Sequence, residues 1–474
     1  MGVLTRAAKK RRLREGGGGE EEERRLDEDH ISRLPEDVLG EIISLLPTKE
    51  GGRTQVISSR WRHLWRSAPA NLDFHGGSGA AISGILSSHH GPIRRFAVHT
   101  IYGEHKDPAA VVDVWLRSPA LDNLQELEFR LGIWHWDPPP PPSPLPASAR
   151  RFSSTLRAAC FGGCCLFPDE GDRDAAAGGE LHLPVLKQLT LVHATVSERS
   201  LQALLAGCPV LDSLLLLDSN GGPRVQIVSP SLRSIGVRSN QSKNRLRQLV
   251  IEDAPRLERF VLFRGNEMDI SVISAPRLDV LRLLSDKFPR ISLGTGTCFQ
   301  VTGSSIVSLT TVLCSVKVLA IPRVELYLGV AINLMKCFPN LEKLYIKTGY
   351  WGKKNAWYRK YQDLIRTLDM RLKKIVLTAY SGNKSHIKFV KFFVSNARVL
   401  ESMTIELEDG DIDSAWIETQ YRMLQIEERA SRGVQFDFVY RNRLIEIESR
   451  SNLRDEREKV HDLSTTDPFE RFPY

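Results

Sequence analysis

The sequence predicts an α/β fold in which a small helical domain precedes a long, curved solenoid of short strands with a cap at its C-terminal end. Three patterns predict it: a pair of amphipathic helices within residues 29–75, an apolar six-residue motif that recurs over residues 90–350, and a strand, turn and helix within residues 355–440. A single repeat of this length cannot bury its own apolar face. The copies must therefore stack to form one continuous core.

The composition indicates a soluble protein. At 474 residues the chain is long enough for two or three domains, and no apolar run approaches the ~20 residues that a membrane helix needs. Of the seven cysteines, Cys160, Cys164 and Cys165 cluster, but their spacing lacks the pairs typical of zinc ligands. We expect reduced, buried thiols, and neither a metal nor a cofactor.

Residues 1–28 form a charged tail that we expect to be disordered. A basic half precedes an acidic half, and the glycines at 16–19 supply a flexible joint. The basic half is a candidate nuclear-import signal and consists of Lys9, Lys10, Arg11, Arg12 and Arg14. The alternative is a solvated charge run, so we expect the protein in the nucleus, the cytoplasm or both.

The first helix of residues 29–75 is expected between two prolines. Pro35 suits a helix start, Glu36 and Asp37 place negative charge at the positive end of the helix dipole, and Pro47 ends the helix. Its apolar residues occupy two adjoining stripes, more surface than one small bundle can bury. They are Val38, Leu39, Ile42, Ile43, Leu45 and Leu46. We therefore expect a partner to cover part of this helix.

The second helix carries aromatic and basic side chains of the kinds that often dominate protein interfaces. Trp61 and Trp65 lie among Arg60, Arg62 and Arg66. The stretch LPEDVLGEIISLLPTKEGGRTQVISSRWRHLW resembles the plant form of the F-box, which implies docking onto the Skp-type adaptor of a cullin–RING ubiquitin ligase. The resemblance assigns the module core and the adaptor-binding surface to Leu34, Pro35, Leu39, Ile42, Leu45, Leu46, Pro47, Trp61 and Trp65. The alternative is a helical hairpin that packs only on its own chain.

Gly51 and Gly52 depart from this family pattern, which usually has helix-forming residues there. Each glycine inside a helix costs roughly 0.8–1 kcal/mol relative to alanine. If both glycines lie within the second helix, the module would be looser than its relatives and could bind the adaptor less tightly.

The motif LxxLxL, with conservative substitutes, recurs eleven times along the rest of the chain. The copies start at Ile93, Leu124, Leu186, Leu211, Leu232, Leu257, Leu278, Val316, Leu341, Leu372 and Leu400, and weaker copies start at Leu156 and Leu246. This is the signature of leucine-rich repeats (LRR): a short strand with its first, fourth and sixth residues in the core, followed by a helix or an irregular return. The alternative is a set of ordinary buried strands in an α/β domain.

Two insertions interrupt the repeats. The proline run Asp137 to Pro146 is expected to form an extended surface loop outside any strand ladder, although such runs can also bind aromatic-lined grooves. Residues 171–179, rich in Asp, Ala and Gly, predict a second exposed loop.

Residues 355–440 resemble the FBD region that follows leucine-rich repeats in many plant F-box proteins. The stretch Arg371 to Leu407 predicts a strand, a turn at residues 381–384 and a closing strand that caps the solenoid. Between them lies a helix with its inward residues at Ile387, Val390, Phe393 and Val394. Residues 441–474 are expected to form a charged C-terminal tail.

No motif of a nucleotide-binding loop, zinc hydrolase, serine hydrolase or kinase is present, so we expect a non-catalytic protein. The resemblance implies a substrate-recognition subunit of an SCF-type ubiquitin ligase, which binds a protein target through its repeats. The alternative is a binding scaffold outside the ubiquitin pathway. The basic stretch Lys343 to Arg398 could also attract nucleic acid, but we expect it to keep exposed faces soluble.

The third, fifth and seventh positions of each repeat alternate away from the core, so they line the concave face. Near the C-terminal end these positions hold Lys343, Tyr345, Lys347 and Lys374, which we predict to bind the target. Earlier repeats place an apolar floor beside them, formed by Leu215, Leu217, Val261 and Phe263. This face would suit a target with an apolar side chain beside acidic or phosphorylated residues. The alternative is that the lysines only keep an exposed sheet soluble.

Overall fold

The structure is a computed structural model. It describes residues 31, 33–74, 79–101, 107–131, 143–165, 181–239, 246–264, 268–283, 291–293, 296–302, 305–308, 312–324, 328–348, 369–407, 414–440 and 453–470. The predicted N-terminal tail with its candidate import signal, the loop at 171–179 and most of the proline run lie outside these residues.

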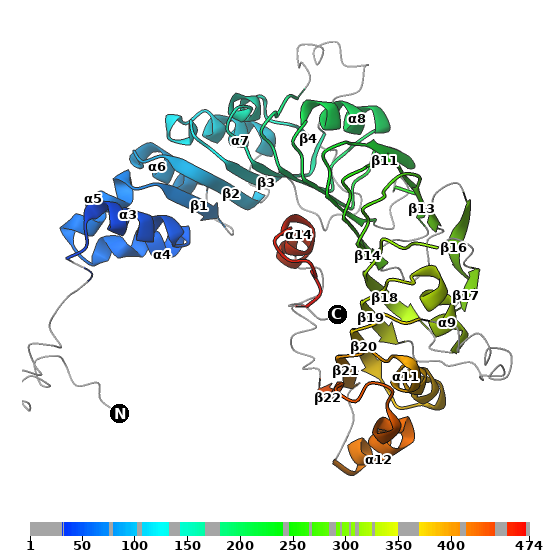
Figure 1. Cartoon of the computed structure of the whole chain (residues 1–474). Coiled ribbons are helices and arrows are strands. Elements are labelled where there is room, and N and C mark those ends of the chain that lie inside the picture. Colours follow the sequence, from blue (N-terminus) through cyan, green and yellow to red (C-terminus); the bar gives the residue numbers. More distant parts are fainter. Residues whose placement is uncertain are drawn as a thin grey trace, which may run out of the picture.

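The helical module comprises four short elements, which lie at one end of the molecule (Figure 1). They are α3 (Glu36–Leu45), α4 (Thr48–Arg53), the 3-10 turn η1 (Thr54–Val56) and α5 (Ser59–Ser67). As the sequence predicts, Glu36 and Asp37 form the acidic first turn of α3, and Pro47 follows its C-terminal end. The structure places Pro35 at the N-cap, one residue before the helix.

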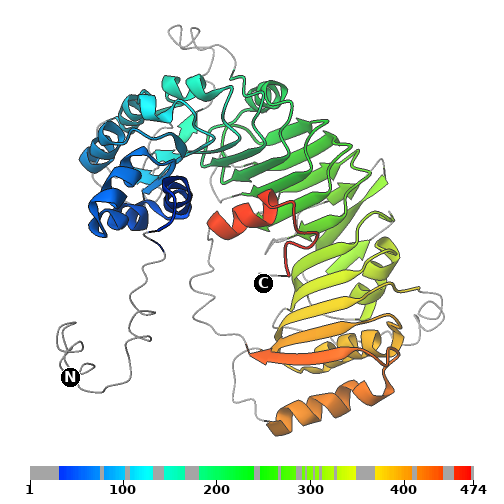
Figure 2. The same cartoon turned by 60° about the vertical axis from the view of Figure 1, so that its left-hand side comes forward.

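After the module, the described residues form a 14-stranded parallel sheet that curves into an arc (Figures 1 and 2). Its strands, in spatial order, are β1 (Ala70–Phe74), β2 (Ile93–Ile101), β3 (Glu126–Leu131), β5 (Ala158–Gly162), β7 (Gln188–Val192), β8 (Ser213–Leu217), β10 (Ser234–Arg238), β12 (Arg259–Arg264), β14 (Val280–Leu283), β18 (Val318–Val324), β19 (Lys343–Thr348), β20 (Lys374–Tyr380), β21 (Ser402–Leu407) and β22 (Gln435–Tyr440). All eleven predicted repeat copies, and the weaker copy at Leu156, supply strands of this sheet.

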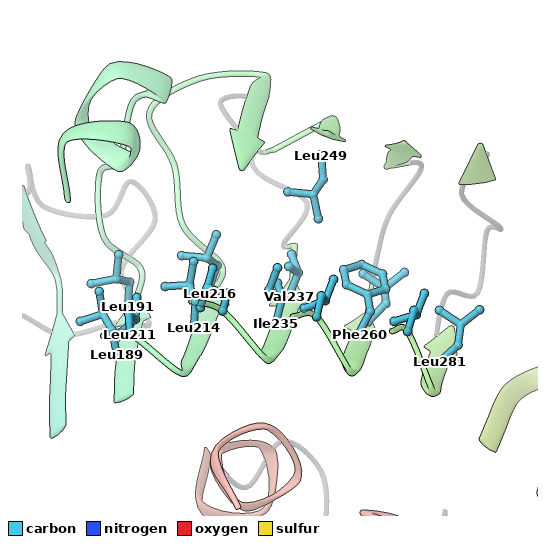
Figure 3. Packing of buried hydrophobic residues seen from close by; sticks show 14 of the residues in the cluster. Leu189, Leu191, Leu211, Leu214, Leu216, Ile235, Val237, Leu249, Phe260 and Leu281 are labelled. Atoms are coloured by element: carbon cyan, nitrogen blue, oxygen red, sulfur yellow. The ribbon is translucent and has the colours of Figure 1, made fainter. Parts of the chain in front are cut away.

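The register of the sheet stacks equivalent repeat positions on one another. Leu189 pairs with Leu214, which pairs in turn with Ile235. These side chains, with Leu191 and Leu216 of the same strands and Phe260 of the neighbouring β12, point into the core on the convex side of the sheet (Figure 3). The predicted core positions of the repeat are therefore confirmed.

Several of the returns, the segments that connect one strand of the main sheet to the next, contain strands of their own. The sequence predicts helices or irregular segments there. Four of these returns supply the six strands of a second sheet on the convex side: β9 (Arg224–Val228), β11 (Gln248–Asp253), β13 (Asp269–Val272), and β15 (Ile291–Leu293), β16 (Gly296–Thr302) and β17 (Ser305–Ser308) from one return. In β9, buried Val225 and Ile227 alternate with exposed Arg224 and Val228, the two-residue period of a strand. The weak copy at Leu246 supplies β11, so its assignment to the main sheet is wrong.

The proline run was expected to stay outside any ladder, and this is wrong at its end. Ser143 and Pro144 form β4 (Ser143–Pro144), which pairs in parallel with β6 (Cys164–Cys165). A proline is tolerated in such a two-stranded ladder, because an edge strand needs to offer hydrogen bonds on one side alone.

Other returns within the described residues contain helices, which cover the convex side. They include α6 (Gly79–Ser88), η2 (Pro119–Leu121), α7 (Pro108–Leu116), η3 (Ala147–Phe152), α8 (Glu198–Gly207) and α9 (Leu328–Cys337). Asp107 caps α7 by accepting hydrogen bonds from the backbone N–H groups of Ala109 and Ala110. Ser197 caps α8, so the return before Leu211 is helical.

The C-terminal region closes the solenoid by extending the same sheet. Its order is β20, α11 (Lys384–Asn396), β21, α12 (Ser414–Leu424), η6 (Ile426–Glu428) and β22. Asn383 caps α11, whose predicted inward residues Val390, Phe393 and Val394 are buried, while Ile387 is half-buried. The predicted strand, turn and helix are confirmed.

After β22 the chain returns along the concave face of the arc. The helix α14 (Leu453–His461) and residues 462–470 lie inside the curve, against the strands in the middle of the sheet (Figures 1 and 2). For residues 441–474 the sequence predicts only a charged tail and does not indicate where it lies. None of the helices in the described ranges is long and apolar enough to cross a membrane.

Candidate functional site

The module has a filled core of its own. Leu39 and Ile43 of α3 face Trp61, Leu64 and Trp65 of α5, and all five side chains are buried. Three of the nine predicted adaptor-binding residues, Leu39, Trp61 and Trp65, therefore support the module from inside and offer no surface to a partner.

Gly51 makes room for this core, and the expectation that it loosens the module is not supported. A Cβ atom at position 51 would lie 2.5 Å from Cζ3 of Trp65, a distance that real Cβ atoms essentially never show. At Gly52 the nearest Trp65 atom would lie 4.0 Å away, an ordinary contact. The first glycine thus lets the indole pack directly on the backbone of α4.

A second apolar stripe of α3 remains at the surface. Val38, Ile42 and Leu45 follow one another at helical spacing, and Ile42 is 36% and Leu45 80% exposed. After α4, Val56 is 88% exposed and Ile57 is also exposed. Val38 is among the apolar residues predicted for α3, but none of Val38, Val56 and Ile57 is in the predicted adaptor-binding set.

The other predicted adaptor-binding residues lie at the margins of the module. Pro35 and Pro47 are exposed, while Leu34 and Leu46 are half-buried. The backbone carbonyl of Leu34 accepts a hydrogen bond from Arg60 Nη2 at 2.7 Å, which ties the start of α3 to α5. We call the exposed residues Val38, Ile42, Leu45, Val56 and Ile57 the module's apolar surface.

Hydrogen bonds fix the module to the first strand of the sheet. Asn71 Nδ2 of β1 donates to the carbonyl of Ser44 at 2.7 Å, and Thr48 Oγ1 donates to the carbonyl of Asn71 at 3.0 Å. On the other side, the backbone N–H groups of His90 and Gly91 both donate to the carbonyl of Arg66. The module is therefore fixed to the start of the repeat sheet by hydrogen bonds from two sides.

The four predicted target-binding residues do lie on the concave face, but that face is covered. Tyr345 is 1% exposed, because Phe469 packs on its ring. Lys343 Nζ lies 3.0 Å from a carboxylate oxygen of Asp467, and Lys374 Nζ lies 3.2 Å from one of Glu470. Lys347 is half-buried. The expectation of an open basic surface is therefore wrong.

The covering residues are 453–470, which we call the C-terminal segment. Glu456 of α14 accepts two hydrogen bonds from Arg238 Nη1, at 2.8 and 2.6 Å, and Arg457 donates to Glu128 at 2.6 Å. Burial raises the pKa of Glu456, an effect that the charge of Arg238 opposes without cancelling. These ion pairs place α14 across β3 and β10.

His461 is buried where α14 ends. Its Nδ1 lies 2.6 Å from Ser213 Oγ and its Nε2 lies 2.7 Å from Thr190 Oγ1. Burial, together with the nearby charge of Arg457, lowers the pKa of His461 to about 3. The imidazole is therefore neutral at physiological pH.

Arg259 and the apolar floor hold the rest of the segment. The guanidinium of Arg259 donates to the carbonyls of Lys459, Asp462 and Thr465 at 2.7, 2.9 and 2.6 Å. The predicted floor of Leu215, Leu217, Val261 and Phe263 packs against Val460 and is buried. Arg282 stacks over the rings of Phe263 and Phe469.

An open, polar cavity of about 1010 Å³ remains between the segment and the first strands. His99 lines it, 2.6 Å from Asp73 and 3.2 Å from Glu128. Burial lowers the pKa of His99, but its hydrogen bonds to the two carboxylates outweigh this and raise it to about 9. The charged groups here are paired with one another. Within the described ranges, no group of His, Cys, Asp and Glu side chains is arranged to hold a metal ion.

Family models match the chain in three consecutive regions. The F-box domain model matches residues 31–71, the model of "FBD-associated F-box protein At5g56370, LRR repeats" matches residues 112–346, and the FBD model matches residues 362–405. None of these three is a family of enzymes. The matches follow the order of the helical module, the curved sheet and its closing strands.

Similar proteins from Arabidopsis thaliana share these regions. F-box/LRR-repeat protein At3g03360 is 28% identical over 272 residues, 55% of this chain and 48% of the relative. F-box/LRR-repeat protein At5g35995 is 24% identical over 491 residues, 87% of this chain and 99% of the relative. F-box/FBD/LRR-repeat protein At1g51370 is 28% identical over 225 residues, 44% of this chain and 46% of the relative. The chain matches about half the length of the first and third relatives.

An F-box, leucine-rich repeats and an FBD region thus follow one another along the chain, and the observed module, repeat sheet and closing strands carry them. The protein belongs to the F-box/LRR/FBD family.

Proposed function

We propose that the protein is the substrate-recognition subunit of an SCF-type cullin–RING ubiquitin ligase. The helical module docks on a Skp-type adaptor, and the repeat sheet binds a protein target. Other subunits supply the ubiquitin thioester. The contribution of this chain is positioning, which raises the effective concentration of a target lysine near that thioester.

The module's apolar surface is the observation that supports the proposal most strongly. The core of the module is already filled by Leu39, Trp61 and Trp65, so Leu45 and Val56 have no place in it. Covering apolar area gains roughly 25 cal/mol per Å² removed from water. A partner surface that covers this stripe would therefore gain free energy without any rearrangement of the module.

The rigid connection between module and sheet supports a positioning role. Hydrogen bonds between Asn71, Ser44 and Thr48 fix the direction of β1 relative to α3 and α4. A target on the repeats is thereby held at a constant distance and orientation from the adaptor. A flexible linker would weaken this effect, because effective concentration falls as a linker lengthens.

Copurification tests the proposal. The tagged full chain, expressed in plant cells, is expected to recover a Skp-type adaptor and a cullin. Ile42→Asp combined with Leu45→Asp is expected to abolish recovery, since it charges the exposed stripe without touching the core. Val114→Asp is the matched control, because Val114 is 65% exposed on α7, outside the module. Equal recovery by all three chains would refute the assignment.

A further inference from the structure

We propose that the C-terminal segment is an exchangeable occupant of the target-binding face, and that targets displace it with a segment of the same chemistry. Such a target segment carries an acidic residue two positions before a phenylalanine, as in Asp467-Pro468-Phe469. This inference rests on the proposed role as a substrate receptor and specifies what that receptor recognises.

The segment covers two separate apolar patches of the concave face. The first comprises Cys160, Val192, Leu215, Leu217, Val261 and Phe263, under Val460. The second comprises Val280, Val318, Ala320, Tyr345 and Val376, under Phe469. Apolar patches of this kind, rimmed by charged side chains, are typical of interaction surfaces once uncovered.

The end of the segment occupies a site with a definite chemical preference. The Tyr345 hydroxyl donates to a carboxylate oxygen of Asp467 at 2.6 Å, and Lys343 Nζ lies 3.0 Å from the same group. Two residues later, Phe469 is buried between the Tyr345 ring, 5.6 Å away, and the guanidinium of Arg282, 5.5 Å away. The face thus offers two donors for a carboxylate beside an aromatic seat.

The segment is held by side chains and is not part of either sheet. Among the described residues, the hydrogen bonds between its backbone and other backbone groups stay within the segment, as from Asp462 N–H to the carbonyl of Glu458. Its other bonds to the sheet come from side chains such as Arg259 and Arg238. The segment can therefore leave without breaking a strand ladder.

Arg238 and Glu128, two sheet residues that form ion pairs with α14, keep other partners on the sheet when the segment leaves. Arg238 remains within 2.7 Å of Asp218, and Glu128 keeps Arg95 and Arg130 at 3.3 and 2.9 Å. A buried charge that loses its one partner is strongly destabilising. Because these charges would not be left alone, the uncovered face is an accessible state of the protein.

Because the segment is tethered to the same chain, it competes with targets for the concave face. The tether thereby sets the affinity that a target needs in order to bind. Twelve residues, 441–452, join Tyr440 of β22 to Leu453 of α14. A short tether of this kind gives an effective concentration on the order of millimolar. A free peptide of the same sequence cannot displace the segment at concentrations far below this value. A target can displace it if its carboxylate and aromatic side chain bind the face more tightly, or if it makes further contacts.

Peptide exchange on the full chain tests the inference. A protease site is introduced within residues 441–452, and the purified protein is cut so that the segment stays in place but loses its tether. A fluorescent peptide of residues 453–470 is then titrated onto cut and uncut protein. We expect the cut protein to bind it at least tenfold more tightly. We also expect the peptide with Asp467→Ala and Phe469→Ala to bind the cut protein at least tenfold more weakly than the original.

The peptide with Thr466→Ala is the matched control, since Thr466 is exposed, and it should bind like the original. Equal binding by cut and uncut protein, or no exchange into the cut protein, would overturn the proposal and make the segment a permanent part of the fold. Adaptor capture is measured on the same samples. Loss of adaptor capture with intact exchange would refute the ligase role alone.

Hydrogen exchange on the uncut chain gives a second test if the cut protein proves unstable. Asp467→Ala with Phe469→Ala should raise the exchange rates of the α14 amides at least tenfold while those of β8 and β10 stay unchanged. If the α14 amides exchange only when the whole sheet unfolds, in this variant as in the original chain, the segment is not an exchangeable occupant.

Discussion

The ring of Phe469 stands edge-on to the ring of Tyr345, with centroids 5.6 Å apart and planes inclined by 66°. These residues are separated by more than a hundred positions in the sequence, yet each buries the other. The contact links the C-terminal segment to β19, in the C-terminal half of the repeat sheet. It is the reason that a residue at a surface position of its repeat, Tyr345, is buried.

Gly51→Ala is expected to destabilise the protein by about 1–3 kcal/mol, the usual range for overpacking a core. The new Cβ would overlap Trp65, so α4 or the indole must shift. Gly52→Ala is the matched control, where the space is open and the better helix propensity should give a small gain of up to about 1 kcal/mol. Denaturant unfolding of both variants measures the difference. Equal effects would show that Gly51 has no special packing role.

Substitutions at a buried and at an exposed position of α3 should have different effects, the first on folding stability and the second on adaptor binding. Leu39→Ala is expected to lower the free energy of unfolding by about 2–5 kcal/mol, because it leaves a cavity in the module. Leu45→Ala should change stability by less than about 0.5 kcal/mol but weaken adaptor binding. Thermal unfolding and adaptor titration of both variants check this. Unchanged adaptor affinity of Leu45→Ala would exclude this residue from the docking surface.

Gly236→Ala should displace α14 from the sheet. A Cβ there would lie 2.4 Å from Cγ2 of Val460 and 2.7 Å from Cδ1 of Leu215, so the helix has to move outward. Hydrogen exchange should show faster exchange of the α14 amides. Gly84→Ala, where nothing lies within 4 Å of the new atom, serves as the control. Identical protection of α14 in both variants would contradict the close packing of helix and sheet.

Acidification should favour release of the segment through His461. In the docked state its pKa is about 3, whereas a solvated histidine has a pKa of about 6.5. Above pH 6.5 the His461 imidazole is mostly neutral whether the segment is docked or released. As the pH falls from 6.5 towards 3, the imidazole binds a proton only in the released state. Docking should therefore weaken by about 1.4 kcal/mol between pH 7.5 and pH 5.5.

Comparison with His461→Gln isolates the contribution of His461, because Glu456 is present in both proteins. The raised pKa of docked Glu456 means that acidification through this residue favours docking, the opposite of the effect of His461. The pKa of Lys459 is lowered to about 7 by burial and by Arg282, so this lysine, like His461, favours the released state as the pH falls from 7.5 to about 6.5. The comparison with His461→Gln removes this contribution too, because Lys459 is present in both proteins. Hydrogen exchange of α14 at both pH values provides the measurement. The same pH dependence in both proteins would show that His461 does not control docking.

Local patterns predicted the main sheet well, because each strand repeats the same requirement. Leu189, Leu214 and Ile235 each fill one layer of a shared core, so the motif appears in every copy. The strand returns were missed because their two-residue period spans few residues, as in Val225 and Ile227. A weak copy of the motif, at Leu246, was therefore assigned to the wrong sheet.

At the candidate sites, local sequence patterns identified the right faces but not which of them other parts of the chain cover. The two stripes of α3 could be read from the sequence, but helical spacing alone does not tell which stripe is buried, as with Leu39, and which remains exposed, as with Leu45. Likewise the third and fifth repeat positions identified the concave face around Lys343 and Tyr345. Nothing local to these strands indicates that Asp467 and Phe469 cover it, because that contact depends on long-range folding.

Direct titration of the purified full chain with a purified Skp-type adaptor tests the proposed ligase role most directly. The original chain and Val114→Asp should bind with the same affinity. Leu45→Asp combined with Val56→Asp charges the two most exposed residues of the module's apolar surface. It should raise Kd at least 100-fold, a loss of about 2.7 kcal/mol, without lowering the unfolding temperature. An affinity of this double variant within about twofold of the original, or no binding by the original chain, would contradict the proposed role.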